Sequence, residues 1–552
     1  MRKSTFKTGS RLLLLLTLAL SVVVTGCQAA TKNNNGVNQA TVSPSATTST
    51  ETDAATNEPV KDGTLIVALS TDVTLLDPTR QGGWQTFLVN RNIHESLVKE
   101  DLSKTSEEAA VVEIIPSLAE TWEVSPDGLT YTFHLRKGVK FQDGTDFNAD
   151  AVEFNVRRAW DKEFEFFDEV SATNMSRIYN DLKSIQAVDA NTFSFTFNHP
   201  FQAFLRLLAQ GSTGSGLIAS PTAIRELGND KYAEHPVGTG PFVFVERVIG
   251  DHVTVKRNDN YWGDKAYAQQ LIFRLIADNN ARATALRTGE VDIILSPAGE
   301  TISSLKQDGF SVPAANLPSV FYLTLNTQNE YFKDIKVRQA FAYAIDRESL
   351  SKDLLEGNAT PAYSAAHTGN EAYDADHKPF PYDPEKAKQL LAEAGYPDGF
   401  GVTIQTYTGN EAYVEWVQRD LAKVGIQLKI ETFDWATFGA QRFMKPEVGV
   451  NTMSWGFVTA YWIYVLGHSE STGRYGGYTN PAIDEVIAKA NNEIDPDKAL
   501  AYWKEARDII DNDVAIVPLF SSNTSLAQGR NVKGLIVPSQ NWFDLTKVWT
   551  EK

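Results

Sequence analysis

The sequence of 552 residues contains a single cysteine, Cys27, so no internal disulfide bond can form. Its eight histidines form no His-x-x-x-His pair and no HExxH motif, the patterns of zinc-dependent hydrolases. The GxSxG turn of serine hydrolases and the GxxxxGK[ST] loop that binds nucleotide phosphates are also missing. Gly238-Thr239-Gly240 is followed by Pro241 and lacks the third glycine of a dinucleotide-binding loop. These absences predict a protein without a cofactor, and no motif indicates an enzyme.

Basic residues are in deficit, with 51 basic against 69 acidic side chains and a net charge of −18. So acidic a chain repels nucleic acid phosphates and anionic lipid headgroups, and we expect neither as a partner. Long apolar runs are absent after residue 24, and no later segment approaches the roughly 20 apolar residues that a membrane-spanning helix needs. We therefore expect no transmembrane helix in the body of the chain.

The N-terminus, in contrast, has the pattern of a secretory signal peptide at 1–26. Three basic residues lie within the first ten, the apolar run Leu12–Val24 follows, and small residues precede Cys27. The ending Val-Thr-Gly-Cys resembles the bacterial lipobox, which implies cleavage before Cys27 and lipid on its sulfur. An ordinary signal with an incidental cysteine is the alternative. Residues 27–62 are rich in Thr, Asn, Ala and Ser and lack aromatic side chains, which predicts a disordered tether.

The chain from residue 63 onward is too long for one hydrophobic core, so we expect two or more lobes. Apolar and polar residues alternate as in strands at 131–135, 192–197 and 426–430. Apolar residues spaced three or four apart predict helices at 150–161, 334–350, 384–394 and 413–423. Helix, glycine and strand follow one another at 413–430, which is typical of an α/β unit.

Several longer motifs follow one another in a fixed order along this body. They are Leu76-Asp77-Pro78, Ile93–Val98, Pro116–Asp161, Pro236–Phe242, Arg257–Gly263, Ala283–Asp292, Leu325-Asn326-Thr327, Lys336–Phe341 and Tyr478–Asp484. Together they resemble the family 5 extracellular solute-binding proteins, the oligopeptide, dipeptide and nickel receptors of ABC importers. The resemblance runs from about residue 63 to the C-terminus.

The resemblance implies an α/β fold of the periplasmic-binding-protein type II class. Such a fold has two α/β lobes that close on a hinge, and an inserted subdomain in the first lobe. The expected boundaries are lobe 1 at 63–315 with the insert at about 100–230, lobe 2 at 316–524, and a return to lobe 1 at 525–552.

For most motif residues we expect a structural role. Tyr261-Trp262 is predicted to pack rather than to bind a ligand. Asp334 and Arg338 stand four residues apart in a predicted helix, a spacing that favours an ion pair on the helix surface.

The stretch after Trp455-Gly456 bears on the ligand. The resemblance implies that peptide receptors place an acidic loop there, whose carboxylate binds the peptide α-amino group, but 457–464 contains no acid. A buried ammonium left unpaired would cost about 3–5 kcal/mol, which weakens the case for a simple peptide. Nickel receptors grip an anionic chelator with arginines, and the corresponding stretches 163–169 and 211–216 are acidic or Gly- and Ser-rich. His468 is a weak metal candidate, with an ordinary surface histidine as the alternative.

These considerations predict an aromatic-lined binding site. The candidate residues are Trp455, Gly456, Tyr461, Trp462 and Tyr464 in one loop, with Trp84 from the segment after the first strand. Aromatic faces stack on sugar rings, peptide side chains or organic cations, whereas the alternative is an aromatic cluster that belongs to the core. Glu165 and Asp168 are candidates to supply negative charge to a cationic ligand, with a solvated acidic helix end as the alternative.

We expect a lipid-anchored, extracytoplasmic receptor that captures a small solute in an interlobe cleft and delivers it to the permease of an ABC importer. Oligopeptides lead the possible ligands, ahead of an oligosaccharide, another organic solute or a nickel chelate. A lipoprotein hydrolase with an unrecognised carboxylate pair is the alternative from another class, and a signalling receptor with the same fold is a third possibility. The protein is expected to be a monomer that touches the membrane only through its lipid.

Overall fold

The computed structural model describes residues 63–551, apart from several short internal gaps. The gaps are 81–82, 109–110, 210–215, 316, 435–436, 440–447, 457, 472–475, 524–525 and 541. The predicted signal peptide, the tether and the lipidation of Cys27 lie outside the described residues and stay predictions.

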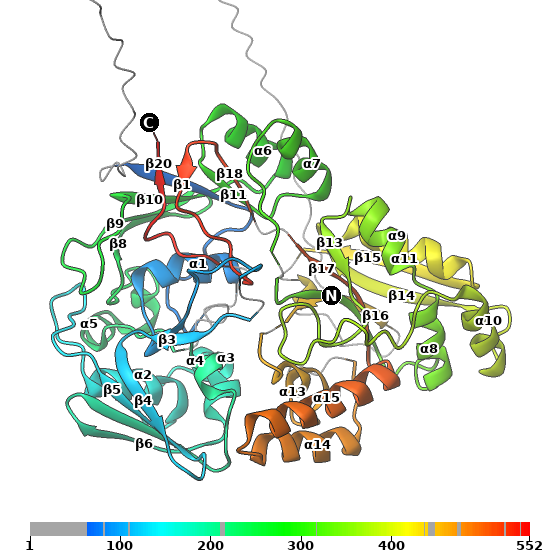
Figure 1. Ribbon diagram of the computed structural model, residues 1–552, viewed down its shortest axis with the longest axis horizontal. Helices are drawn as coiled ribbons and strands as arrows, with labels where there is room; N and C mark the ends of the chain where they lie inside the picture. The colour runs from blue at the N-terminus through cyan, green and yellow to red at the C-terminus, as the bar shows by residue number, and fades with distance from the viewer. Residues whose placement is uncertain are drawn as a thin grey trace, which may run out of the picture. The chain divides into compact units, whose positions relative to one another are not determined.

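The first of two six-stranded sheets organises what we call lobe 1 (Figure 1). Its strands are, in spatial order, β18 (Leu526–Gln528), β11 (Ile293–Leu295), β1 (Thr64–Leu69), β10 (Gln270–Leu275), β9 (His252–Arg257) and β8 (Phe242–Val248). β1 pairs in parallel with both β10 and β11, while β9, β8 and β18 add antiparallel edges. The accompanying helices are α1 (Trp84–Ile93), α6 (Asn279–Thr288) and α7 (Gly299–Gln307). Parallel central strands with helices alongside are the α/β arrangement that the sequence predicts.

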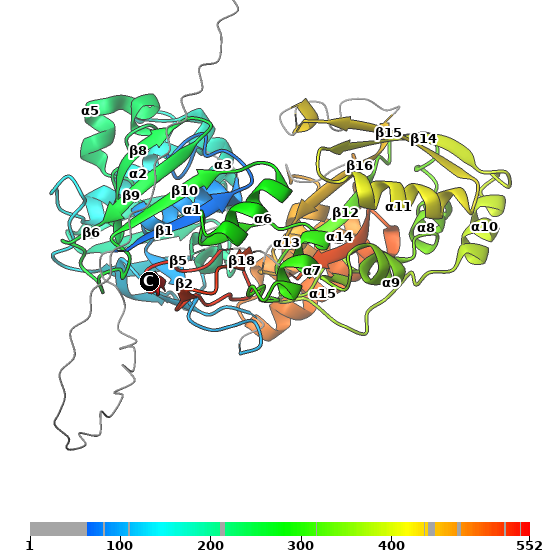
Figure 2. The same ribbon diagram turned by 90° about the horizontal axis from the view of Figure 1, so that it is seen from above.

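The second six-stranded sheet organises lobe 2. Its order is β13 (Ala359–Pro361), β17 (Ile516–Ser522), β12 (Val320–Leu325), β16 (Val448–Trp455), β14 (Phe400–Tyr407) and β15 (Ile426–Phe433). Its helical segments are α8 (Ile335–Tyr343), α9 (Arg347–Ser349), the π-helical turn η2 (Leu350–Leu354), α10 (Pro384–Glu393), α11 (Glu411–Ala422), α13 (Trp462–Gly467), α14 (Pro481–Asn492) and α15 (Pro496–Asp513). Figure 2 shows β14, β15 and β16 side by side with α11 next to them.

A four-stranded antiparallel sheet is inserted into lobe 1 between β1 and β8. It consists of β4 (Ala119–Val124), β5 (Thr130–Leu135), β7 (Thr192–Phe197) and β6 (Leu182–Asp189). Its helices are α2 (Ala149–Trp160), α3 (Glu169–Tyr179), α4 (Phe204–Ala209) and α5 (Pro221–Tyr232). We call this sheet with its helices the insert. Two separate two-stranded sheets complete the described strands: β2 (Val98–Glu100) with β3 (Ile114–Pro116), and β19 (Val532–Lys533) with β20 (Trp549–Thr550).

Most secondary structure that the sequence predicts is present. The strands at 131–135 and 192–197 lie within β5 and β7, and Asn148 caps α2 by accepting from the amide of Ala151. One prediction is wrong: residues 334–350 do not form a single helix. α8 ends at Tyr343, and Asp346 then caps a new turn, because its carboxylate accepts from the amide of Ser349.

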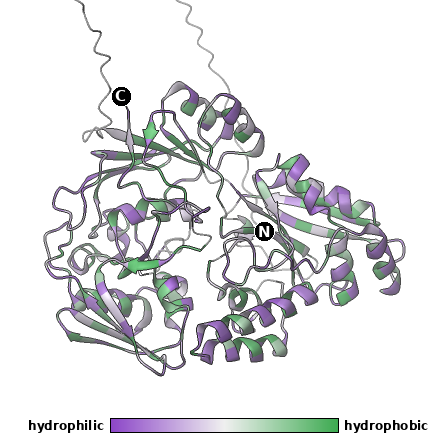
Figure 3. Cartoon of the chain, viewed as in Figure 1, coloured by the Kyte–Doolittle hydropathy of each residue, from purple (hydrophilic) through white to green (hydrophobic). Residues whose placement is uncertain are grey.

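Apolar stripes explain why the helices lie against the sheets. α15 buries Ala499, Trp503, Ala506 and Ile510 at spacings of three or four residues, which places them on one face of the helix. In Figure 3, α14 and α15 accordingly alternate green and purple along their length.

The predicted surface pair of Asp334 and Arg338 is also wrong. Arg338 is only 8% exposed and donates to the backbone oxygens of Phe332 and Asp513, at 2.9 and 2.8 Å. Asp334 instead caps α8 by accepting from the amide of Lys336 at 2.8 Å. Both side chains therefore hold backbone groups rather than each other.

Buried Glu95 gives the motif residues around it their structural role. Its carboxylate accepts from Thr239 Oγ1, Tyr261 Oη and Trp262 Nε1, at 2.8, 2.7 and 2.8 Å. Burial raises the pKa of Glu95, although these three hydrogen bonds oppose the shift. Tyr261-Trp262 therefore packs and hydrogen-bonds inside lobe 1, as the sequence predicts.

The chain crosses between the sheets twice, in an outgoing crossing segment between α7 and β12 and in a returning one between β17 and β18. Of their described residues, Ala315 and Asn523 are neighbours, and the amide of Ala315 donates to the oxygen of Asn523 at 2.8 Å. After the return, buried Glu100 accepts from Gln540 Nε2 and Trp542 Nε1, each at 2.8 Å. The chain thus changes sheet between β11 and β12 and again between β17 and β18; the domain boundaries given above remain predictions.

Candidate functional site

Trp455 and Gly456 stand at the carboxyl end of β16, beside the outgoing crossing segment. Trp455 is half-buried and pairs with Val320 at the start of β12. A Cβ atom on Gly456 would lie 2.7 Å from the oxygen of Pro318, 2.9 Å from Cε1 of His367 and closer still to Nε2 of the same ring. Only glycine therefore fits where the strand end, the crossing segment and the loop after β13 meet.

The loop after β13 forms a small, open pocket beside this strand end. It is lined by Pro361, Ala362, Tyr363, Ser364, Ala366, His367, Thr368, Tyr373, Asp374, Ala375, His377, Lys378 and Ser521. His367 is 1% exposed, and its Nδ1 lies 2.8 Å from the oxygen of Thr368. The lining offers hydroxyl and imidazole groups together with the charged side chains of Asp374 and Lys378, and all of these can hydrogen-bond to a polar ligand group.

Two buried histidines make stability depend on pH. Burial lowers the pKa of His94 and of His367 to about 4, from an ordinary 6.5. The unfolded chain therefore takes up protons near pH 6.5, whereas the folded chain does so only near 4. The free energy of unfolding should be constant above that window and fall as the pH is lowered through it.

Urea unfolding at about pH 7.5 and about pH 5 measures this effect. His94→Gln, which can still hydrogen-bond to Tyr232 Oη, should reduce the loss between the two pH values. Asn155→Ala, which removes hydrogen bonds but no titratable group, is the control and should retain the wild-type loss. Identical pH dependence in wild type and His94→Gln would contradict the assignment.

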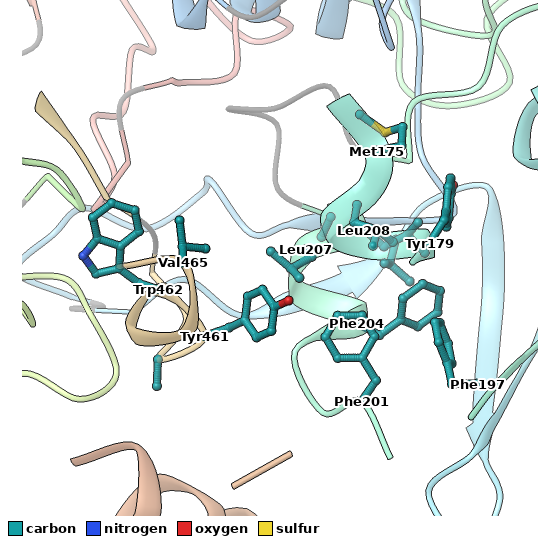
Figure 4. Packing of buried hydrophobic residues seen from close by; sticks show 14 of the residues in the cluster. Met175, Tyr179, Phe197, Phe201, Phe204, Leu207, Leu208, Tyr461, Trp462 and Val465 are labelled. Carbon is teal, nitrogen blue, oxygen red and sulfur yellow. The ribbon is translucent and has the colours of Figure 1, made fainter. Parts of the chain in front are cut away.

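The aromatic residues after Gly456 differ in what they contact (Figure 4). Trp462 is completely buried, and its Nε1 donates to the oxygen of Ala365 at 3.1 Å. Tyr461 is also buried, stacks on Tyr464 at 4.8 Å and meets Phe201 of the insert at 5.5 Å. Both side chains therefore belong to the hydrophobic core, the alternative given above, because their burial leaves no face exposed to a ligand. Trp455 and Tyr464 stay half-buried.

Trp84 is the first residue of α1 and is half-buried against the core of lobe 1. The next residue, Gln85, fastens the helix start, because its Oε1 accepts from the amides of Ser70 and Thr71 at 2.9 and 3.2 Å. α1 therefore holds Trp84 at the end of β1.

The two acidic residues predicted for the site, Glu165 and Asp168, also differ in their exposure to solvent. Glu165 is exposed. Asp168 is 8% exposed, caps α3 by accepting from the amide of Ser171 at 2.7 Å, and lies 3.2 Å from Arg80 Nε. Its charge is already balanced, so it offers no free negative charge to a cationic ligand.

His468 has structural partners. Its ring stacks on Tyr464 at 4.6 Å, its Nδ1 accepts from the amide of Glu470 at 3.2 Å, and its Nε2 is 3.8 Å from Asp484. Among the described residues, no group of three or more His, Cys, Asp or Glu side chains is placed to hold a metal ion.

Sequence reasoning missed Glu371 and Arg206. Glu371 Oε2 accepts from the amide of Ala460 at 3.0 Å, so an acid does contact the loop after Gly456. Arg206 Nε lies 2.9 Å from Glu371 Oε1. Residues this far apart in the sequence leave no local pattern, and only the fold brings them together.

Comparison with known proteins identifies the family. Residues 113–473 match the model of the bacterial extracellular solute-binding proteins, family 5. The glutathione-binding protein GsiB of Shigella flexneri is 32% identical over 87% of this chain and 93% of its own. The structure of DppA from Helicobacter pylori with the peptide STSA has a TM-score of 0.79 at 30% identity, covering 89% of this chain and 98% of that one. AppA of Bacillus subtilis with a nonapeptide has a TM-score of 0.76 at 25% identity, covering 90% and 100%.

The chain therefore belongs to the family 5 bacterial extracellular solute-binding proteins, with the type II periplasmic-binding-protein fold. It is a solute-binding protein of the type that serves ABC transporters, and the members of this family are receptors rather than enzymes. Among the described residues, no helix has both the length and the apolar character to cross a bilayer.

Proposed function

We propose that this protein captures a short peptide between its two lobes and delivers it to the permease of an ABC importer, without catalysing a reaction. The observation that carries the proposal is similarity over nearly the whole of both chains to a glutathione-binding protein and to receptors solved with bound peptides. Glutathione is itself a tripeptide, so these relatives share one chemical class of ligand. Binding that favours closed lobes needs no covalent step.

The proposed ligand contacts are Trp455, Gly456, Tyr464 and Trp84. Trp455 at the end of β16 and Tyr464 in α13 are both half-buried and keep exposed surface, and Trp84 lies at the end of a lobe 1 strand. Ligands of open α/β sheets bind beyond the carboxyl ends of their strands, which suits both positions. Glu165, which is exposed, stays a weaker candidate.

The location of the protein belongs to the same proposal. The lipobox-like ending at Cys27 supports a lipid anchor on the outer face of the cell membrane, as expected for a receptor that feeds a permease. We propose a monomer, since a receptor with two closing lobes encloses its ligand without a second copy.

Ligand-induced stabilisation tests the function. Native mass spectrometry of protein from its own host gives the mass of the bound ligand, and unfolding is then measured with that ligand, with glutathione and with tri- and tetrapeptides. A true ligand at about 100 times its Kd should add roughly 2.7 kcal/mol to the free energy of unfolding. Peptides that leave stability unchanged, or that are hydrolysed, would contradict the proposal.

Trp455→Ala should remove this stabilisation while the ligand-free variant stays folded, because Trp455 is half-buried at the strand end. Tyr267→Ala, which removes a half-buried aromatic ring elsewhere in lobe 1, is the matched control and should respond to ligand like the wild type. Equal stabilisation of Trp455→Ala and wild type would place the site elsewhere.

A further inference from the structure

Arg206 of the insert reaches across to lobe 2. It lies on α4, and its Nη1 donates to the oxygen of Val112 at 2.6 Å, which fixes the guanidinium to lobe 1. Its Nε lies 2.9 Å from Glu371 Oε1, and the two side chains are 19% and 31% exposed. Partial burial reduces screening by water and salt, so this pair is stronger than an ordinary surface pair.

Glu371 is held in lobe 2 by two hydrogen bonds. Its own amide donates to the oxygen of Val458 at 2.8 Å, and its Oε2 accepts from the amide of Ala460 at 3.0 Å. One carboxylate therefore holds the loop that follows Trp455-Gly456 with one oxygen and Arg206 with the other. A movement of that loop would therefore displace the Glu371 carboxylate and change the distance between it and Arg206.

Apolar contacts surround the pair. Tyr461 meets Phe201 at 5.5 Å, and the residues of α4 and α13 belong to one continuous buried cluster. Figure 4 shows the ring of Tyr461 directed from the α13 side toward Leu207 and Phe201. Gln202 of the insert also donates to the backbone oxygen of Glu493 in lobe 2. These contacts exist only while the insert and lobe 2 are together.

We propose that Arg206 and Glu371 form an interlobe latch that favours the closed form and slows ligand release. This inference rests on the proposed function, because a ligand held between the lobes leaves only when they separate. A contact present in one conformation and absent in the other shifts their equilibrium by its own free energy. The loop that follows the proposed ligand contacts Trp455 and Gly456 shares Glu371 with the latch, so that one side chain couples binding to closure.

A double-mutant cycle on ligand dissociation tests the latch. Arg206→Gln and Glu371→Gln should each speed dissociation of the bound peptide about tenfold, since a partly buried, charge-assisted contact is lost. Glu371→Gln keeps a side-chain oxygen that can still accept from the amide of Ala460, so the variant removes the ion pair without removing the loop contact. The double variant should be no faster than either single one, because the same contact is already broken. Lys140→Gln, which breaks the exposed pair with Asp146, should leave dissociation unchanged.

Small-angle scattering of the ligand-free variants gives a readout that needs no ligand. Arg206→Gln and Glu371→Gln should have a larger radius of gyration than wild type, and high salt should enlarge wild type toward them. Multiplicative rate effects in the double variant, or unchanged radii, would overturn the latch while peptide binding stands. A wild type that binds no peptide but shows the expected radii would overturn the proposed function and support the latch.

Discussion

Asp77→Ala is expected to lower the free energy of unfolding by about 3–5 kcal/mol. Asp77 and Arg158 are 0% and 1% exposed, and their closest atoms, Oδ2 and Nη2, are 2.5 Å apart. The guanidinium also donates to Asn229 Oδ1 at 2.9 Å and to Thr79 Oγ1 at 3.3 Å. Removing the carboxylate leaves a buried positive charge without its counter-ion, and two neutral oxygens cannot replace it.

Urea unfolding of Asp77→Ala against wild type measures this loss. Asp146→Ala, which removes a carboxylate that is 71% exposed, is the control and should change stability by less than about 1 kcal/mol. Adding Arg158→Leu to Asp77→Ala should restore part of the stability, since the stranded charge is removed as well. A double variant less stable than Asp77→Ala would show that packing, rather than the uncompensated charge, dominates.

Trp462→Ala is expected to cost a similar amount, about 3–5 kcal/mol, because it leaves a large cavity in lobe 2. The indole is fully buried, meets Trp455 at 5.5 Å and Tyr322 at 6.3 Å, and hydrogen-bonds to Ala365. Its loss removes apolar burial and also leaves a buried carbonyl unpaired.

Comparison with Trp462→Phe and Trp455→Ala separates packing from binding. Trp462→Phe keeps most of the apolar volume and should lose clearly less stability than Trp462→Ala. Trp455→Ala removes a half-buried ring and should cost less stability than Trp462→Ala. If Trp462→Ala kept wild-type stability and lost only ligand binding, Trp462 would be a ligand contact and its assignment to the core would be wrong.

Local sequence patterns predicted the helices and strands of this fold better than they predicted the tertiary contacts of individual side chains. Alternation within 131–135 and apolar spacing within 150–161 specify β5 and α2, because both patterns depend on neighbouring residues alone. The sequence did not predict that the helix ends before Asp346, because the apolar spacing continues past that residue. The contact that the amide of Asp346 makes with the carboxylate of Asp420 lies outside the helix and leaves no local pattern. Arg338 was placed at the surface because spacing cannot show that the oxygen of Asp513 comes close.

The candidate site was harder to predict for the same reason. Trp455, Tyr461, Trp462 and Tyr464 are alike in sequence, and only the tertiary structure decides which of them is covered. Lobe 2 residues Tyr322 and Ala365 cover Trp462, whereas Phe201 of the insert covers Tyr461. The acid that contacts this loop, Glu371, is 89 residues from Ala460 along the chain. A contact of that separation is a property of tertiary structure.

The return of the chain to lobe 1 has a consequence for biosynthesis. β18 pairs with β11, and Trp542 satisfies the carboxylate of Glu100 from 442 residues further along. Lobe 1, whose first strands are made early, is thus completed only once residues 526–542 have been made. Until then β11 lacks its antiparallel neighbour β18 and Glu100 lacks the indole of Trp542, so lobe 1 cannot reach its final packing before lobe 2 has been synthesised.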